Sequence, residues 1–349
     1  MTFEEIFSID TSNMYGLIKK FPEQVEAAVV IGNVAKARLA VRSIRNIVLC
    51  GLGGSAIGGD LLKSYLAREL KVPFVVNRYY TLPSFVGKNS LVIVSSYSGN
   101  TEETLSSFKE AQKRGAKILC ISSGGGVEKL ARKKRTPIIR IPGELPPRAA
   151  LGYSFFPLLI TLGKLGLIRN KKQEIVETVA LLKQKSDEYG VPDAASNKAL
   201  QLAEQLHGRL GVVYSSAERF DAVATRWRGQ MAENGKSLMF GHVLPEMNHN
   251  ELVGWKALTG QMPEMRVVFL RDKDDHPRVK VRMDITRGII AEQTKHMAEV
   301  WSEGTSPLAR MFSLVYLGDW VSFYLAILYG IDPTPVEVID YLKAELSRV

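Results

Sequence analysis

The sequence predicts an α/β protein with two parallel sheets flanked by helices, in a flavodoxin-like three-layer αβα arrangement. The first observation is a pair of glycine/serine turns at residues 51–55 and 95–101, each of which follows an apolar run and precedes a helical pattern. Apolar runs then keep alternating with segments of helical length, which is typical of parallel strands joined by right-handed crossovers. The third observation is a second strand–helix series that begins near residue 210.

The first half of the chain supplies one complete sheet. A helical lead-in is expected over residues 1–27, where apolar side chains recur at helical spacing. Strands are expected at 47–50, 74–77, 91–95, 117–121 and 137–141, with helices near 56–70, 101–114, 126–134 and 151–168. We therefore expect an N-terminal domain over 28–170, followed by a polar connecting helix over 171–197.

The second half echoes this pattern without obvious sequence repetition. Strands are expected at 210–214 and 266–270, and a helix at 219–233. A long apolar helix over 305–329 precedes a short amphipathic one near the C-terminus. These elements predict a C-terminal domain over 198–349 with the same architecture.

The most apolar stretch, 311–331, has the length of a membrane helix. Gly318 and Asp319 interrupt it, and two serines lie inside it. We expect a buried helix at a domain or subunit interface and no membrane partner.

Composition narrows the class of protein further. The two cysteines, Cys50 and Cys120, end apolar strands and imply no disulfide framework. The N-terminus shows no secretory pattern, so a cytoplasmic protein is expected. The net charge of +10 favours an anionic substrate. The basic cluster at 129–140 lacks interleaved aromatic residues and is interpreted as a solvated helix end, with no nucleic-acid partner.

The two turns predict a site for a phosphorylated small molecule. Each aims backbone N–H groups and the positive end of a helix at one point, and hydroxyls add neutral donors. A nicotinamide cofactor is disfavoured because no acidic residue ends the strand at 74–78. The alternatives are a tight strand–helix junction without ligand, or hydroxyls that only cap the second helix. The candidate substrate-binding residues are Gly53, Gly54, Ser55, Ser96, Ser98 and Thr101.

This pair of turns resembles the sugar isomerase (SIS) domain, which binds phosphosugars. The segments 146–153 (Pro-Pro-Arg-Ala-Ala-Leu-Gly-Tyr), 233–236 (Glu-Asn-Gly-Lys) and 245–251 (Pro-Glu-Met-Asn-His-Asn-Glu) follow in that order. Together they resemble the bifunctional phosphoglucose/phosphomannose isomerases of archaea and some bacteria, over nearly the whole chain. The resemblance implies that glucose 6-phosphate and mannose 6-phosphate are each interconverted with fructose 6-phosphate through a cis-enediol. No cofactor and no metal are expected, and the five histidines lack ligand spacing.

The resemblance also implies roles for individual side chains. Glu233 matches the base that removes the C2 proton. His249 matches the residue that opens the sugar ring, because a histidine both donates and accepts protons near neutral pH. His242 is the competitor for that role, and the Asn-His-Asn-Glu context favours His249.

Two cations complete the expected active site. Arg148 is expected to bind substrate and to stabilise the enediolate charge, with a structural salt bridge as the alternative. Lys343 matches the lysine that assists ring opening in the family, with a solvated surface lysine as the alternative. Thr334 is a weaker candidate that would shape the space around C1 and C2.

The resemblance implies a homodimer with the active site near the subunit interface. Two other interpretations stay open from the sequence alone. One is another SIS aldose–ketose isomerase, and the other is a non-catalytic SIS module that binds sugar phosphate without turnover.

Overall fold

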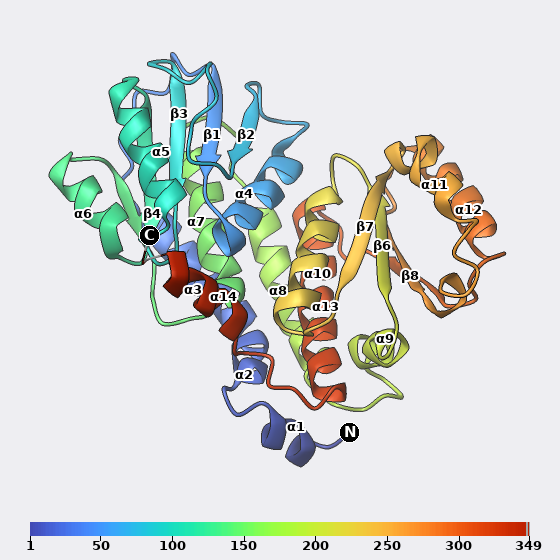
Figure 1. Ribbon diagram of the computed structural model, residues 1–349. Helices are drawn as coiled ribbons and strands as arrows, with labels where there is room; N and C mark the ends of the chain where they lie inside the picture. The colour runs from blue at the N-terminus through green and yellow to red at the C-terminus, as the bar shows by residue number, and fades with distance from the viewer. Residues whose placement is uncertain (347, 349) are drawn as a thin grey trace. The chain divides into compact units, whose positions relative to one another are not determined.

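The computed structural model describes residues 1–346 and 348, and the chain divides into two compact units (Figure 1). The β1–β5 unit comprises Lys20–Leu181 and Gly304–Ala309. The β6–β9 unit comprises Met1–Lys19, Leu182–Glu303 and the chain from Arg310 onward. Each unit is built around one sheet.

The β1–β5 unit holds a five-stranded sheet in the order β2-β1-β3-β4-β5, with every pair parallel. Its strands are β1 (Asn46–Cys50), β2 (Phe74–Asn77), β3 (Ser90–Ser95), β4 (Lys117–Ser122) and β5 (Ile138–Arg140). This is the flavodoxin-like order, in which the chain reverses direction across the sheet between β1 and β3. The strand ends at β1 and β3 are therefore the expected ligand-binding edge.

Helices cover both faces of this sheet, as the three-layer prediction requires. Alternate residues Val48, Val92 and Cys120 pack with Phe108 of α5 and Val127 of α6 in one core cluster. The opposite face meets α4, which lies close to Leu49 and packs against α7. The helices are α3 (Phe21–Val34), α4 (Gly53–Leu66), α5 (Glu102–Lys113), α6 (Gly125–Lys133), η1 (Pro147–Ala149) and α7 (Leu151–Lys164).

The β6–β9 unit holds a four-stranded parallel sheet in the order β7-β6-β8-β9. Its strands are β6 (Gly211–Ser216), β7 (Met239–Leu244), β8 (Arg266–Arg271) and β9 (Met297–Trp301). The sequence predicted β6 and β8 but not the two edge strands. This order repeats the first four positions of the other sheet, so the reversal falls between β6 and β8.

Helices flank this sheet as well. Tyr214 and Phe269 pack with Met283 of α12 on one face, while Trp227 of α10 donates a 2.8 Å hydrogen bond to the Leu314 carbonyl of α13 on the other. The N-terminal helices join this unit, where Tyr15 packs on Trp320 at 5.5 Å. The elements are α1 (Phe3–Ile9), α2 (Met14–Lys19), α8 (Lys172–Tyr189, which continues from the other unit), α9 (Lys198–Leu206), α10 (Asp221–Glu233), η2 (Glu246–His249), α11 (Glu251–Gly254), η3 (Met262–Glu264), α12 (Pro277–Ile290), α13 (Pro307–Leu328) and α14 (Glu337–Leu346).

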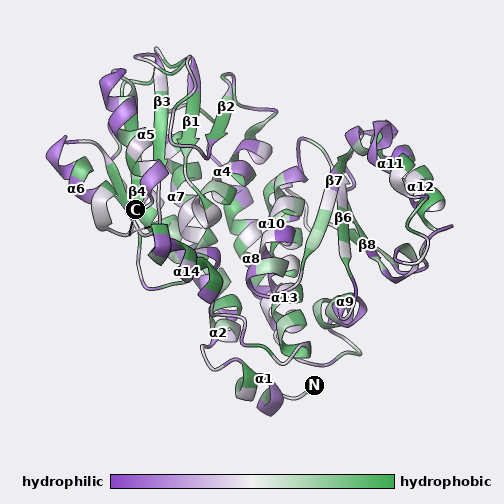
Figure 2. Ribbon diagram, in the orientation of Figure 1, coloured by the Kyte–Doolittle hydropathy of each residue, from purple (hydrophilic) through white to green (hydrophobic). Residues whose placement is uncertain are grey.

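The long apolar helix is α13. Among the described residues, Pro307–Leu328 is the one helix long and apolar enough to span a membrane, and 94% of its most apolar window is buried. Figure 2 shows that the strands β1, β3 and β4 also consist mostly of apolar residues. The prediction of a buried helix is confirmed, and other residues of the same chain are sufficient to cover it. The apolarity of α13 is therefore no argument for a subunit interface.

Candidate active site

The β3–α5 turn is shaped by hydrogen bonds of its own hydroxyl groups. The Ser96 hydroxyl lies 2.9 Å from the Thr101 hydroxyl and accepts a 3.1 Å hydrogen bond from the Gly99 N–H. Gly99 has a φ of 73°, a left-handed conformation that glycine adopts without strain. Ser98 is exposed, and its hydroxyl accepts from the Asn100 N–H at 3.3 Å. Ser96 and Thr101 thus shape the turn, while Ser98 lies at its surface.

The first turns of α4 and α5 lack side-chain caps among the described residues. Leu52 occupies the N-cap of α4, and Thr101 occupies that of α5 without a capping hydrogen bond. Thr101 therefore occupies the N-cap position, as the capping interpretation expected, but its side chain makes no capping hydrogen bond to the helix. Uncapped first-turn N–H groups carry the positive end of the helix dipole and favour an anion.

The two turns are tied to each other through Ser55 and Tyr97. The Ser55 hydroxyl accepts a 3.1 Å hydrogen bond from the Tyr97 N–H. Gly51 and the Ser95 carbonyl are so close that a Cβ at Gly51 would lie 2.8 Å from that oxygen. Ser55 is buried and positions the second turn, whereas Gly53 is exposed beside it, with a φ of 50°.

A third turn, after β4, belongs to the same edge and was missed in the sequence. The Tyr97 carbonyl accepts from both the N–H and the hydroxyl of Ser123, at 3.0 and 2.6 Å. A Cβ at Gly99 would overlap the Gly124 carbonyl oxygen, and the Asn100 side chain accepts from the Gly126 N–H at 2.9 Å. The signal was the run Ser-Ser-Gly-Gly-Gly at 122–126, directly after an apolar strand.

Arg148 lies on η1, which packs against the start of α4. A Cβ at Gly54 would overlap the Pro147 carbonyl oxygen, so glycine is required for this approach. Gln24 of α3 holds the end of η1, donating to the Ala149 carbonyl at 2.7 Å and accepting from the Gly152 N–H at 2.8 Å. Arg148 is 3% exposed. The fold therefore places η1, which carries the buried Arg148, against the N-terminus of α4, where Gly53 and Gly54 lie.

Glu233 is the last residue of α10 in the β6–β9 unit and is half-buried. The next residue, Asn234, is fully buried and donates a 3.1 Å hydrogen bond to Ser322 of α13. Lys236 has a left-handed φ of 51°, and its ammonium donates to the carbonyls of Glu233, Pro333 and Pro335 at 2.6, 3.0 and 2.5 Å. Lys236 thus joins the end of α10 to the loop before α14.

His249 does not lie beside Glu233 within this unit. Glu233 ends α10 before β7 begins, whereas His249 is exposed on η2 after β7 ends. The six residues of β7, at about 3.3 Å each, put roughly 20 Å between these two edges. The competitor His242 lies within β7, where its Nδ1 accepts from the Val243 N–H at 2.8 Å.

Lys343 lies on α14 and is exposed. Its ammonium is 3.5 Å from Asp340, an exposed i,i+3 pair. The preceding loop is fixed by Asp332, which accepts from the Thr11 hydroxyl at 2.7 Å and from the Thr334 N–H at 2.9 Å. Partial burial alone would raise the pKa of Asp332, but hydrogen bonds from Thr334, Thr11 and Ser12 hold it below the usual value.

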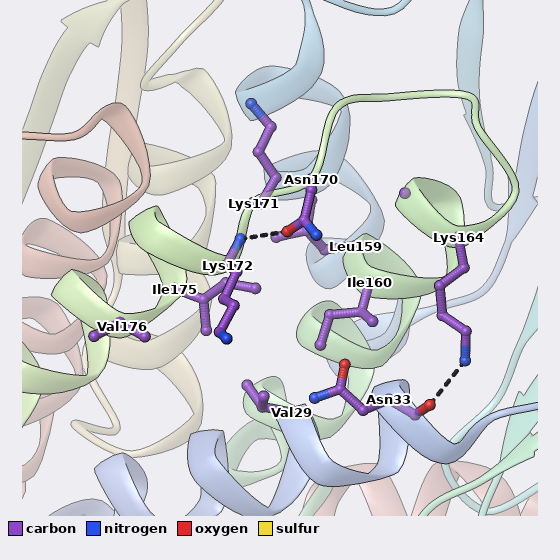
Figure 3. Close-up of a pocket in the computed structure, with 11 residues that line it drawn as sticks. Val29, Asn33, Leu159, Ile160, Lys164, Asn170, Lys171, Lys172, Ile175 and Val176 are labelled. Carbon is purple, nitrogen blue, oxygen red and sulfur yellow. Dashed lines mark hydrogen bonds between the residues drawn. The ribbon is translucent and has the colours of Figure 1, made fainter.

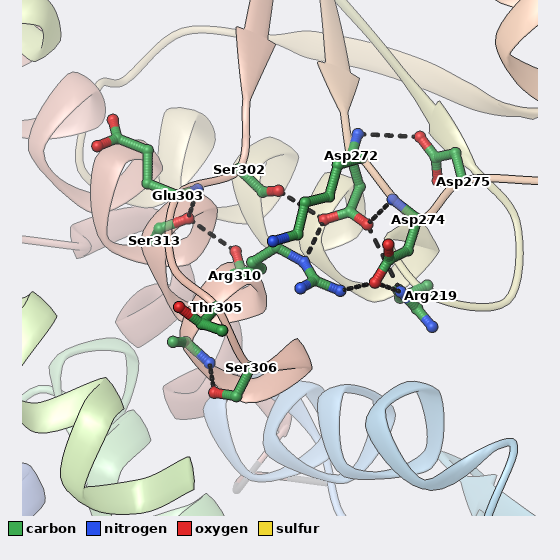
Figure 4. Close-up of polar contacts among 12 residues, drawn as sticks. Arg219, Asp272, Asp274, Asp275, Ser302, Glu303, Thr305, Ser306, Arg310 and Ser313 are labelled. Atoms are coloured by element: carbon green, nitrogen blue, oxygen red, sulfur yellow. Dashed lines mark hydrogen bonds and ion pairs between the residues drawn. The ribbon is translucent and has the colours of Figure 1, made fainter.

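The strand ends of the second sheet hold a charged cluster instead of a phosphate turn (Figure 4). Asp272 is fully buried between Arg310, at 2.8 Å, and the Ser302 hydroxyl, at 2.5 Å. Asp275 accepts from Ser216 at 2.5 Å, and burial raises the pKa of Asp275. Arg219 and Arg310 pair with Asp272 and Asp274 at this edge, so both guanidinium groups are already engaged by carboxylates and not available to a phosphate. The signal in the sequence was the run Arg-Asp-Lys-Asp-Asp at 271–275, directly after the predicted strand at 266–270. Its partners Ser216, Ser302 and Arg310 lie far away in the chain and could not be read from it.

These two sheets and the strand-end turns define an SIS protein. Residues 40–144 match the family model described as SIS domain, and residues 195–346 match that of the bacterial phospho-glucose isomerase C-terminal SIS domain. A solved structure of a hypothetical protein from Thermus thermophilus has the same fold, with a TM-score of 0.77 and 15% identity over 99% of this chain and 93% of that one.

The curated relatives place the chain more narrowly. A bifunctional phosphoglucose/phosphomannose isomerase from Caldicellulosiruptor bescii is 44% identical over 96% of this chain and 99% of the relative. One from Aquifex aeolicus is 40% identical over 87% and 91%. This chain belongs to the bifunctional phosphoglucose/phosphomannose isomerase family, and is an aldose–ketose isomerase of that type.

Proposed function

We propose that the protein interconverts fructose 6-phosphate with glucose 6-phosphate and with mannose 6-phosphate at the carboxyl edge of the β1–β5 sheet. The observation that carries this proposal is the pair of uncapped helices, α4 and α5, whose turns are braced through Ser55 and Tyr97. The 6-phosphate is held there by backbone N–H groups together with the Ser98 hydroxyl. The N-terminal domain over 28–170 binds the phosphosugar, and the domain over 198–349 contributes Glu233, His249 and Lys343.

In the proposed chemistry, Glu233 removes the C2 proton of the open-chain aldose. The C2–H bond breaks, its electron pair forms the C1=C2 double bond, and the C1 oxygen takes up negative charge. A proton passes from O2 to O1, and the protonated carboxyl returns its proton to C1 as the C2 carbonyl forms. Arg148 stabilises the enediolate, and Lys343 and His249 move protons during ring opening.

The same enediol explains the double specificity. Glucose 6-phosphate and mannose 6-phosphate differ only in configuration at C2, and loss of the C2 proton makes that carbon planar in both. One carboxylate therefore serves both substrates if the pocket allows rotation about the C2–C3 bond.

The separation of Glu233 and His249 supports a homodimer in which His249 comes from a second copy. Both residues belong to the β6–β9 unit but lie at opposite ends of β7. A single copy of this unit does not bring them to one substrate. In a twofold dimer, each site would combine Glu233 of one chain with His249 of the other.

Two exposed apolar stripes support the same assembly. On α12, Val281 and Ile285 are 46% and 58% exposed, and on α14, Val338 and Leu342 are 83% and 57% exposed. Residues spaced by four lie on one face of a helix. The α12 helix carries four basic residues and one acidic residue, whereas α14 carries three acidic residues and one lysine. The two stripes thus offer apolar and charge-complementary surfaces near His249 and Lys343 for a second copy to cover.

Subunit mixing tests the shared site. Glu233→Gln and His249→Ala homodimers should each be nearly inactive. After denaturation and refolding together, about half of the dimers should be mixed, and each should regain one intact site, which restores about a quarter of wild-type activity. If refolded mixtures stay as inactive as the parents although mass spectrometry shows mixed dimers, each site belongs to one chain.

A coupled assay tests the placement of the reaction. Fructose 6-phosphate should yield both aldose phosphates at a rate proportional to enzyme, and Ser98→Ala should raise KM for fructose 6-phosphate by weakening phosphate binding. An unchanged KM in Ser98→Ala would place the phosphate elsewhere.

We also propose a cytoplasmic location. Cys50 and Cys120 are free and buried, and burial raises the pKa of their thiols to about 11 and about 12. Such thiols stay protonated and unreactive, which suits a compartment where disulfides do not form.

A further inference from the structure

The β1–β5 unit contains a cavity of about 370 Å³ that plays no part in the proposed reaction (Figure 3). It lies between α3, the end of α7 and the start of α8. Its walls are aliphatic and come from all three helices: Val29, Leu159, Ile160, Ile175 and Val176. This size falls within the range of small-molecule pockets in proteins.

The polar groups of the cavity are cationic or neutral. Three lysines and two asparagines line it, and no lining residue is acidic. The Lys164 ammonium is engaged by the last carbonyls of α3, at 2.9 Å from Asn33 O and 2.6 Å from Ala35 O. Lys171 is engaged by Glu69 at 2.6 Å.

Lys172 and the Asn33 side chain differ from these two lysines. Both point toward the aliphatic walls in Figure 3. Within residues 1–346 and 348, neither the Lys172 ammonium nor the Asn33 carboxamide has a hydrogen-bond or ion-pair partner. Both residues are exposed, so water solvates their polar groups when no ligand is bound. Together with the aliphatic walls they provide a cationic head-group position beside a hydrophobic one.

We propose that this cavity binds a small monocarboxylate with an aliphatic body. The carboxylate accepts from the Lys172 ammonium and the Asn33 amide, and the hydrocarbon packs on Val29, Ile160 and Val176. A sugar phosphate does not fit this site, because the aliphatic walls offer no partners for its hydroxyls. A neutral hydrocarbon gains no charge-assisted hydrogen bond from the ammonium.

The cavity is separate from the phosphate turns within the same unit. Arg148 lies just before the first turn of α7, whereas the cavity meets Leu159 to Lys164 at the other end. An α-helix of 14 residues is about 21 Å long. Binding in the cavity is therefore measurable with the phosphate site left empty, and it does not depend on the proposed isomerase activity.

Octanoate is the probe, titrated into the full chain by calorimetry and followed by ligand-observed NMR, with 1-octanol as the neutral comparison. We expect saturable binding of one octanoate per chain and weaker binding of octanol. Lys172→Gln should weaken octanoate binding on the order of tenfold, as loss of a charged hydrogen bond does, and leave octanol unchanged. Lys129→Gln, which removes the same charge from exposed α6, should change neither.

The variant Val176→Trp tests the hydrophobic part of the cavity. Val176 is 61% exposed, so the larger side chain is tolerated by the fold and fills the mouth of the cavity. Binding of both octanoate and octanol should be lost while the melting temperature stays near that of the wild type. Absence of saturable octanoate binding, or binding that survives both Lys172→Gln and Val176→Trp, overturns the proposal.

Discussion

Glu233 is the proposed base of the chemical step. Replacing it by Gln keeps the shape of the side chain and removes the base, so kcat should fall by roughly 10²–10⁴-fold on both aldose phosphates. KM should change little, because the phosphate turns lie in the other unit and are untouched. Steady-state kinetics on glucose 6-phosphate and mannose 6-phosphate measure this. Near-normal kcat on both substrates would show that the base is another residue.

Lys236 is a positioning residue for the same region. Its ammonium donates to the carbonyls of Glu233, Pro333 and Pro335, so Lys236→Met removes three charge-assisted hydrogen bonds. We expect faster amide exchange at Thr334 and Val336, which flank Pro335, and a lower kcat with little change in KM. Lys256→Met, at an exposed lysine in the loop after α11, is the matched control. Unchanged exchange at Thr334 and Val336 would show that the loop is held by other contacts.

At the scale of elements, Gly99 is the residue on which the two neighbouring turns depend. A side chain there meets both a left-handed φ and the Gly124 carbonyl. Gly99→Ala should therefore displace the β3–α5 and β4–α6 turns and raise KM for every sugar phosphate at least tenfold. Gly115→Ala is the control, since Gly115 has a similar φ of 68° but open space around it. If both variants lose only stability and keep the wild-type KM, the turns do not bind the phosphate.

Asp332 gives the elements around α14 a defined pH dependence. Its pKa is held below the usual value in the folded protein, so the stability it contributes is present above the unfolded pKa and is lost as pH falls through the folded one. Protection against amide exchange at Ser12 and Thr334, taken relative to the intrinsic rate at each pH, should fall as the solution is acidified below about pH 4. In Asp332→Asn that protection should already be low at neutral pH and should show no further step. A step that persists in the variant would assign the transition to another carboxyl group.

The buried strands and the edge strands β2 and β5 were predictable from sequence, whereas the edge strands β7 and β9 were not. Strands β1, β3 and β8 are buried along almost their whole length and appear in the sequence as continuous apolar runs. The edge strands β7 and β9 are mostly half-buried or exposed, and carry His242 and Glu299, so they show no such run. The Arg310–Asp272 pair was likewise invisible, because it joins α13 to the end of β8 across 38 positions.

In the candidate site, too, local motifs were predicted and contacts between distant residues were missed. The turns at Gly53–Ser55 and Ser96–Thr101 were found because each is a local motif. Tyr97 was missed as their common brace, since its partners Ser55 and Ser123 lie on other strands' turns. The opposite placement of Glu233 and His249 around β7 follows from the topology of the sheet, which the sequence did not reveal once β7 itself was overlooked.

At the scale of the whole molecule, the two SIS sheets have diverged in what their strand ends hold. The β1–β5 sheet ends in hydroxyls and backbone donors, while the β6–β9 sheet ends in Asp272, Asp275 and Arg310. Sugar phosphate should therefore bind once per chain. Calorimetry with fructose 6-phosphate on Glu233→Gln, which does not turn over, should give a stoichiometry near one. Two equivalent sites per chain would contradict the assignment of the charged cluster.

In the proposed reaction, one enediol formed by one base serves both substrates. Fructose 6-phosphate converted in deuterated water and followed by NMR tests it most directly. Glucose 6-phosphate and mannose 6-phosphate should both form, deuterium should enter C2 of both to the extent that the protonated carboxyl exchanges with solvent, and Glu233→Gln should abolish both products together. Formation of only one of the two aldose phosphates, or loss of one product and not the other in Glu233→Gln, would mean that the two substrates do not share one base.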